Sequence, residues 1–145
     1  VGVRVVQLDY KSVVHVEFVV DTEDQMWREI ERVMQDKLVT LAITPTLEIH
    51  IPTQYSRRYS VVGYGELLRF STLVQKMILE DKVAHTGSMA LAEHMNRAVM
   101  VKTAQGAVLS SQKSPGPIEL ARVAVFAISL VSKPTNRQKP MLVVS

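Results

Sequence analysis

One predicted helix is apolar on nearly every side, and it constrains the fold more than any other feature. It runs from Ile118 to Val131 and follows a basic loop rich in serine, proline and glycine, Ser110–Pro117. A helix without a polar face has to be buried, so the rest of the chain must form layers that cover it. Pro117 suits the first helical position, which places Glu119 in the first turn, where the helix dipole favours a carboxylate.

Length and composition fit one domain large enough for such a core. The chain has 145 residues, 47% of them hydrophobic, and a formal net charge of +3. It contains no cysteine, which excludes disulfides, thiolate zinc sites and cysteine nucleophiles. The longest apolar run is too short to cross a bilayer, so we expect a soluble chain without a membrane partner. The mild positive charge is compatible with a polyanionic partner but does not require one.

Two β-branched runs at the start of the chain predict an antiparallel hairpin. They cover Val1–Leu8 and Ser12–Val20 and flank the turn-like residues Asp9–Lys11. His15 and Glu17 fall on one face of the second strand because alternate residues of a strand point the same way. A solvated strand face explains this pair best, and a metal-binding pair is the alternative.

The remaining apolar patterns predict helices that alternate with short strands. In order, we expect a helix capped by Thr22, a buried strand at Leu38–Ile43, a helical turn plus loop within Pro45–Arg58, a strand at Tyr59–Tyr64, a helix at Glu66–Asp81, an extended linker at Val83–Gly87, a helix at Met89–Met100, a hairpin of Val101–Thr103 with Ala107–Leu109, and the apolar helix. This order predicts an α/β fold with a mixed sheet flanked by helices.

A mixed sheet of this order is also the arrangement of ribonuclease-H-like nucleases. In those enzymes, acids from strand ends and from a last helix hold two divalent cations, which activate water and stabilise the leaving oxygen. We expect residues 1–132 to form this domain. Residues 133–145 are expected to form a basic C-terminal tail, either a solvated terminus or a DNA contact.

Four segments together carry a resemblance to a known family. They are Val62–Leu67 (VGYGEL), Val83–Gly87 (VAHTG), Leu91–Val99 (LAEHMNRAV) and Ser110–Arg122 (SSQKSPGPIELAR). In this order they resemble the C-terminal nuclease domain of the large terminase subunit of tailed bacteriophages, particularly those of actinobacterial hosts. The resemblance covers the chain from about Val13 to Ser132.

The resemblance implies a ribonuclease-H-like, Mg²⁺- or Mn²⁺-dependent endonuclease that cuts concatemeric double-stranded phage DNA during packaging. It also implies a viral protein of the host cytoplasm, with the portal and the small terminase subunit as partners. The packaging ATPase would be a separate domain. This chain has no Gly-x-x-x-x-Gly-Lys-[Ser/Thr] motif, so we expect no ATP hydrolysis here.

Carried over residue by residue, the resemblance assigns one metal position to a carboxylate. The family's last metal-binding acid falls on Glu119, whereas the acid after the central strand falls near Thr44, which has no carboxylate. The hairpin matches the family's second and third strands, so the first acid would precede Val1. Glu48 is the candidate substitute as catalytic and metal ligand, and Asp9 would substitute only with another hairpin register.

Three residues are candidates for contacting DNA. Lys113 and Ser111 border the start of the apolar helix, where they would reach a phosphate; the alternative is a solvated loop. His85 is a candidate from the second segment, with a packed or surface histidine as the alternative. Glu119 itself could simply complement the helix dipole and pair with Arg122.

Three functions therefore remain open. The leading hypothesis is the nuclease domain of a DNA-packaging terminase. The second is a catalytically impaired ribonuclease-H-like domain that serves as a DNA-binding or docking module. The third is an unrelated α/β subunit that assembles with partners.

Overall fold

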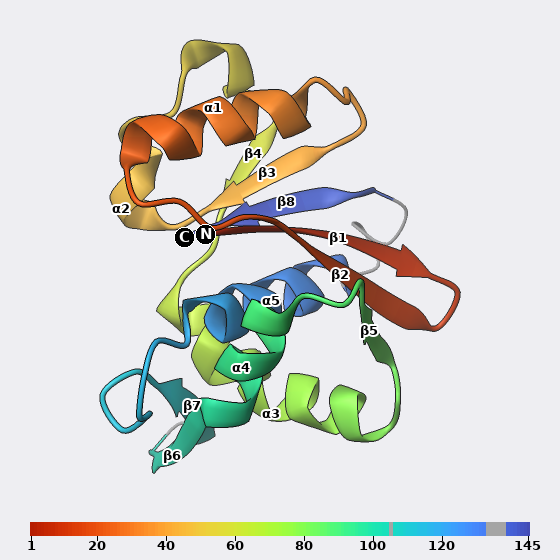
Figure 1. The fold of residues 1–145 in the computed structure, drawn as a ribbon. Helices are drawn as coiled ribbons and strands as arrows, with labels where there is room; N and C mark the ends of the chain where they lie inside the picture. The colour runs from red at the N-terminus through yellow and green to blue at the C-terminus, as the bar shows by residue number, and fades with distance from the viewer. Residues whose placement is uncertain (105, 133–138) are drawn as a thin grey trace.

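The computed structural model describes residues 1–104, 106–132 and 139–145. Within these residues, a mixed sheet lies between two helical layers, and a separate hairpin stands beside the lower layer (Figure 1). The strands of the sheet are β1 (Gly2–Leu8), β2 (Lys11–Phe18), β3 (Thr40–Ile43), β4 (Tyr59–Val61), β5 (Val83–His85) and β8 (Met141–Val144), and the hairpin is β6 (Val99–Thr103) with β7 (Gly106–Ser110). The helices are α1 (Glu23–Met34), α2 (Pro45–Glu48), the 3₁₀ turn η1 (Thr53–Tyr55), α3 (Tyr64–Leu79), α4 (Met89–Arg97) and α5 (Glu119–Val131).

The sheet has the order β4-β3-β8-β1-β2-β5. Strand β1 is antiparallel to both of its neighbours, β2 and β8, whereas β3 is parallel to β4 and β8, and β5 is parallel to β2. Strands β3, β4 and β8 therefore begin at one end of the sheet, which we call the amino end. They finish at the opposite, carboxyl end, where β1 begins. The predicted α/β class and mixed sheet are confirmed.

Helix α5 is the buried centre of one layer, as its sequence predicts. All of its residues from Leu120 to Val131 except Arg122 are buried, and they pack with β1, α3 and α4 into one core. The prediction for Pro117 is wrong, because the helix begins at Glu119. Ile118 precedes it with φ −130°, outside the helical range, so Glu119 takes the first helical position.

Helix α1 covers the other face of the sheet and forms a second core. The predicted cap is present: the Thr22 hydroxyl accepts a hydrogen bond from the Gln25 N–H, and the two residues form a capping box. Ile30, Val33 and Met34 are buried. Met26 is also buried. Trp27 lies at the edge of this core, where its Nε1 donates a hydrogen bond to the Glu23 carboxylate at 3.2 Å.

The C-terminal strand is the largest departure from the predicted fold. Of the expected tail, residues 133–138 lie outside the described residues, but Met141–Val144 forms β8, between β1 and β3 in the middle of the sheet. Met141 and Val143 pack into the α5 core, and Leu142 and Val144 into the α1 core. Four consecutive apolar residues suit this place because a central strand is covered on both faces.

Two shorter segments complete the comparison with the sequence. The predicted linker Val83–Gly87 is partly a strand, since Val83–His85 pairs with β2 as β5. The first hairpin is antiparallel as predicted, but Lys11 belongs to β2, where it lies opposite Leu8, and Asp9 stands in the turn with φ 54°. Asp9 is therefore a turn residue, and the alternative register is excluded.

Candidate functional site

The start of α5 lies at the carboxyl end of the sheet. Strands β3 and β8 finish there side by side, with Ile43 opposite Val144, and Thr44 follows Ile43. Val1 and Ser145 exchange backbone hydrogen bonds of 2.8 and 3.1 Å at the same end. Burial lowers the pKa of the Val1 amino group, and the nearby Glu119 carboxylate raises it in part. Glu119, in the first turn of α5, therefore lies close enough to the Val1 amino group to influence its pKa.

His94 of α4 caps the start of α5. Its Nδ1 accepts a hydrogen bond from the backbone N–H of Leu120 at 3.0 Å, while Ile118 has no capping side chain. Burial and the neighbouring Arg97 lower the pKa of His94, against the opposing influence of Glu119. A neutral imidazole with an unprotonated Nδ1 is what this hydrogen bond requires. The contact fixes α4 against the helix that carries Glu119.

The loop before α5 is held by its own serine side chains. The Ser114 hydroxyl accepts from the Val99 N–H at 2.9 Å and donates to the Ser110 carbonyl at 2.6 Å. The Ser110 hydroxyl in turn accepts from the Lys113 N–H at 3.2 Å. This geometry fixes the backbone of the loop, whereas the Lys113 side chain stays exposed.

Ser111 lies beside Arg122 rather than alone in solvent. The Arg122 guanidinium reaches the Ser111 hydroxyl at 3.5 Å, and the described residues contain no ion pair between Arg122 and Glu119. The alternative role of Glu119, pairing with Arg122, is therefore not seen. Together, Glu119, His94, Ser111, Lys113 and Arg122 are called the α5 site below.

Arg97 adds a further cation close to this loop. A Cβ at Gly116 would lie 2.7 Å from the Nη1 of Arg97, so the guanidinium packs directly on the glycine. The same side chain pairs with Glu93 at 3.4 Å, across one turn of α4. The glycine thus gives the arginine room to approach the loop that leads into α5.

Glu48 lies on the other face of the sheet. It ends α2, and its carboxylate accepts a hydrogen bond from the Tyr59 hydroxyl at 3.4 Å. Tyr59 packs against the α1 core, whereas Glu119 starts a helix of the α5 core. The structure records no contact between these two carboxylates in the described part of the chain.

His85 borders a different hollow from the α5 site. Its Nδ1 accepts from the Gly87 N–H at 3.1 Å. With Leu91, Met95 and Asn96 it lines an apolar hollow of about 250 Å³ between β5, α4 and the later turns of α5. The structure thus brings Ser111 to Arg122 of α5, leaves the Lys113 side chain exposed on the loop before α5, and places His85 elsewhere.

The single carboxylate of the α5 site, Glu119, does not fit a two-metal centre. Hard divalent cations prefer several oxygen ligands, and paired cations need several carboxylates. Across residues 1–104, 106–132 and 139–145, no group of three His, Asp or Glu side chains is placed to hold a metal ion. Thr44, which follows Ile43 at the end of β3, has a hydroxyl and no carboxylate.

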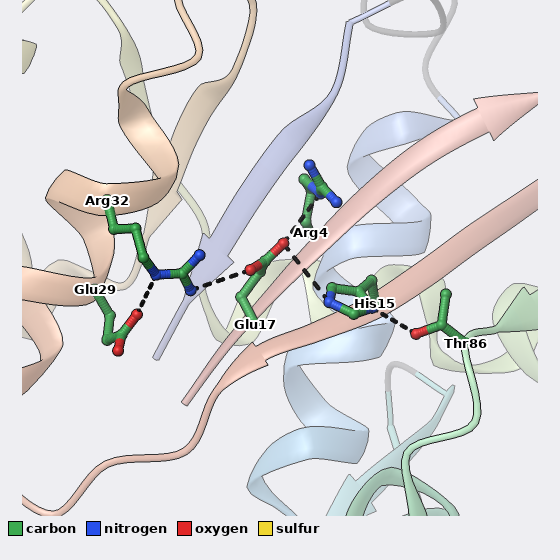
Figure 2. A network of polar contacts seen from close by, with 6 residues as sticks. All are labelled: Arg4, His15, Glu17, Glu29, Arg32 and Thr86. Atoms are coloured by element: carbon green, nitrogen blue, oxygen red, sulfur yellow. Dashed lines mark hydrogen bonds and ion pairs between the residues drawn. The ribbon is translucent and has the colours of Figure 1, made fainter.

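The His15–Glu17 face is an ion-pair network, contrary to the expected solvated face. Glu17 is only 8% exposed and pairs with Arg4 at 3.1 Å and with Arg32 of α1 at 3.2 Å (Figure 2). His15 lies 3.8 Å from the same carboxylate, and its other ring nitrogen is 2.5 Å from the Thr86 hydroxyl. Glu17 thus pairs with both guanidinium groups, and its pair with Arg32 links α1 to the sheet.

Sequence reasoning missed the contributions of His94 and Arg97 to the α5 site. Both lie in Leu91–Val99, one of the four segments quoted for the resemblance. The sequence indicated this segment, but it did not predict which of its residues contact the start of α5. The contact of His94 with Leu120 joins residues of two separate helices. Helical periodicity alone does not predict such a contact between two helices, because a histidine suits both a buried and an exposed position.

Among the helices of the described residues, none is long and apolar enough to span a membrane. Comparisons with known proteins complete the description of the site. Neither a protein-family model, nor a curated protein sequence, nor a solved structure matches this chain.

Proposed function

We propose that this chain is the ribonuclease-H-like nuclease domain of a viral DNA-packaging terminase and acts on double-stranded DNA at the α5 site. The observation that carries the proposal is the place of Glu119. It stands in the first turn of the last long helix, at the end of the sheet where β3 and β8 finish. The family resemblance expects its last acid at such a helix start.

The strand directions support the same proposal. The β1–β2 hairpin is antiparallel, and the parallel strands β3 and β4 lie on the far side of β8. The resemblance matches this hairpin to the family's second and third strands. Strand β8 lies between the hairpin and β3, and its sequence, Met-Leu-Val-Val, brings no carboxylate.

The polar groups around Glu119 suit contact with a DNA backbone. Lys113 and Arg122 supply positive charge, and Ser111 supplies a hydroxyl, which are the groups that position a phosphate. The serine contacts of the loop hold its backbone before any ligand binds, which reduces the ordering cost of binding. His94 keeps the helix start in place and is a positioning residue in this account.

The second candidate is a domain that binds DNA without cutting it. The single carboxylate that the described residues bring to the α5 site favours this candidate. We therefore derive no metal-dependent step from these residues. Cleavage would need further carboxylates at the carboxyl end of the sheet.

A plasmid-nicking assay with Mg²⁺ or Mn²⁺ separates the two candidates, with Glu119→Ala as the paired variant. Nicking by wild type that is lost in the variant supports the nuclease. Intact supercoiled DNA with both proteins, together with a salt-sensitive shift of DNA in a gel, supports the binding module. Absence of both nicking and DNA binding would overturn both candidates and leave the unrelated α/β subunit.

A further inference from the structure

Three cations gather at the amino end of the sheet, opposite the α5 site. Lys37 lies in the turn between α1 and β3, Arg57 precedes β4, and Lys139 precedes β8. Because these three strands are parallel, their starts meet at one place. The three side chains line one surface hollow of about 320 Å³, which we call the basic hollow.

Arg58 builds the floor of the basic hollow. Its guanidinium donates to the carbonyls of Val39 at 2.8 Å, of Asp36 at 3.0 Å and of Met34 at 3.3 Å. These carbonyls include the last turn of α1, where the helix dipole favours a cation. Arg58 thus binds backbone carbonyls of the protein itself, and these contacts fix the turn that carries Lys37.

The other three cations are exposed and have no acidic partner among the described residues. The carboxylate of Asp36, the neighbouring acid in the turn, accepts a hydrogen bond from the Leu38 N–H at 3.0 Å. Three lysines elsewhere on the described surface pair with an acid, as Lys11 does with Asp81 at 3.3 Å, whereas Lys102 and Lys113 have no ion pair among the described residues. Like charges that share a hollow repel one another, and a bound anion removes that repulsion.

We propose that the basic hollow binds phosphate groups of a nucleic-acid backbone. The cations are spread over three segments on long side chains, which suits successive phosphates of a polymer better than one enclosed ion. Leu38, which also lines the hollow, is 73% exposed, so the hollow is open to solvent and accessible to a large ligand. The inference rests on the proposed function in taking duplex DNA as the polymer.

The basic hollow and the α5 site lie at opposite ends of a sheet whose strand β3 is short compared with one turn of duplex DNA. They lie at opposite ends of β3, which has four residues and is about 13 Å long at the usual rise per residue. One turn of duplex DNA is about 34 Å long. The hollow therefore provides a second contact point, and it requires no carboxylate or metal.

The test measures binding of a fluorescent duplex of about 20 base pairs by anisotropy, in EDTA, over a range of salt. The variant is Lys37→Gln/Arg57→Gln/Lys139→Gln. Its matched control, Arg28→Gln/Lys76→Gln/Lys102→Gln, removes the same charge from exposed positions on α1, α3 and β6. We expect the hollow variant to lower the slope of log affinity against log salt by about 2 to 3, and to bind at least tenfold more weakly at low salt.

Equal losses in the two triple variants, or no loss in either, would overturn the inference. Arg57→Gln alone should lower the slope by about 1, which keeps the test decisive if the triple variant folds poorly. Inorganic phosphate that binds the hollow while duplex DNA does not would overturn the assignment to a polymer backbone. Because EDTA prevents metal-dependent cleavage, a failed nicking assay leaves this result unaffected, and the two failures are distinguishable.

Discussion

The hydrogen bond from Leu120 N–H to His94 should set both the stability and the acid sensitivity of the α5 site. We consider His94→Ala, which removes the only side chain that caps α5 in the described structure. Loss of a capping acceptor costs about 1 kcal/mol of unfolding free energy. Since urea slopes of small domains are about 1 to 3 kcal/mol per molar, the urea midpoint should fall by roughly 0.3 to 1 M at pH 8.

The pH dependence follows from the lowered pKa of His94 in the folded protein. An unfolded histidine takes up its proton near pH 6.5, whereas the folded protein resists that proton. The unfolded state therefore binds more protons in this window, and stability rises with pH. The stabilising contribution is present above about pH 6.5 and is lost as the pH falls toward and through the lower, folded pKa.

The assay is urea unfolding of wild type and variant at pH 8 and at pH 5. The difference between their free energies of unfolding should shrink at pH 5, because protonated His94 no longer accepts the Leu120 hydrogen bond. His94→Gln, which keeps an acceptor that does not titrate, serves as control and should show less acid sensitivity than wild type. A difference between wild type and His94→Ala that is zero at pH 8, or constant with pH, would refute the reasoning.

Three further substitutions test other contacts by urea unfolding or DNA binding. Glu17→Gln should lower the free energy of unfolding by about 1 to 3 kcal/mol, because it leaves two guanidinium groups without their shared carboxylate. Glu29→Gln affects Arg32 alone and should lower it by under about 1 kcal/mol. Equal losses would contradict the network. Leu142→Ala should lower the free energy of unfolding by about 2 to 5 kcal/mol, because this side chain in β8 is 0% exposed. Leu38→Ala, at a position that is 73% exposed, should change it by no more than about 0.5 kcal/mol. A Leu142→Ala variant as stable as wild type would show that β8 is not a central strand. Ser114→Ala should cost about 1 kcal/mol and weaken duplex binding by loosening the loop that carries Lys113; unchanged binding would remove the loop from the interface.

Strong local patterns predicted most of the fold. The first hairpin follows from two β-branched runs with a short turn between them, and α1 follows from the capping box of Thr22 and Gln25. Helix α5 follows from an apolar segment too long for a strand. In each case the decisive residues are neighbours along the chain.

The parts that sequence did not predict depend on distant pairing. Strand β8 is four residues long and follows a basic, proline-bounded segment, and its place is fixed by β1 at the other end of the sequence. Strand β5 has only three residues, too few for a periodic pattern. Such short segments become strands because neighbouring strands offer free backbone groups and a buried place.

The candidate site was predicted in part for the same reason. Glu119, Ser111 and Lys113 belong to one continuous segment, and within it Ser111 contacts Arg122, one turn after Glu119 in α5. Glu48 was assigned from its distance along the chain after β3, but its direction is set by Tyr59 and the α1 core. The turn residues Pro45–Glu48 have no periodicity that would reveal which face of the sheet they join.

In the proposed complex, DNA lies against the α5 site, with Glu119 beside its phosphates. The most direct measurement is the affinity of a duplex for Glu119→Gln in EDTA at low salt, with Glu31→Gln on the exposed face of α1 as control. Removing a carboxylate beside the phosphates relieves about 0.5 kcal/mol of repulsion across roughly 8 Å of water, and more where water is partly excluded. The account predicts binding about twofold to fivefold tighter for Glu119→Gln and unchanged for Glu31→Gln, whereas unchanged binding by Glu119→Gln, or equal tightening by both variants, would contradict it.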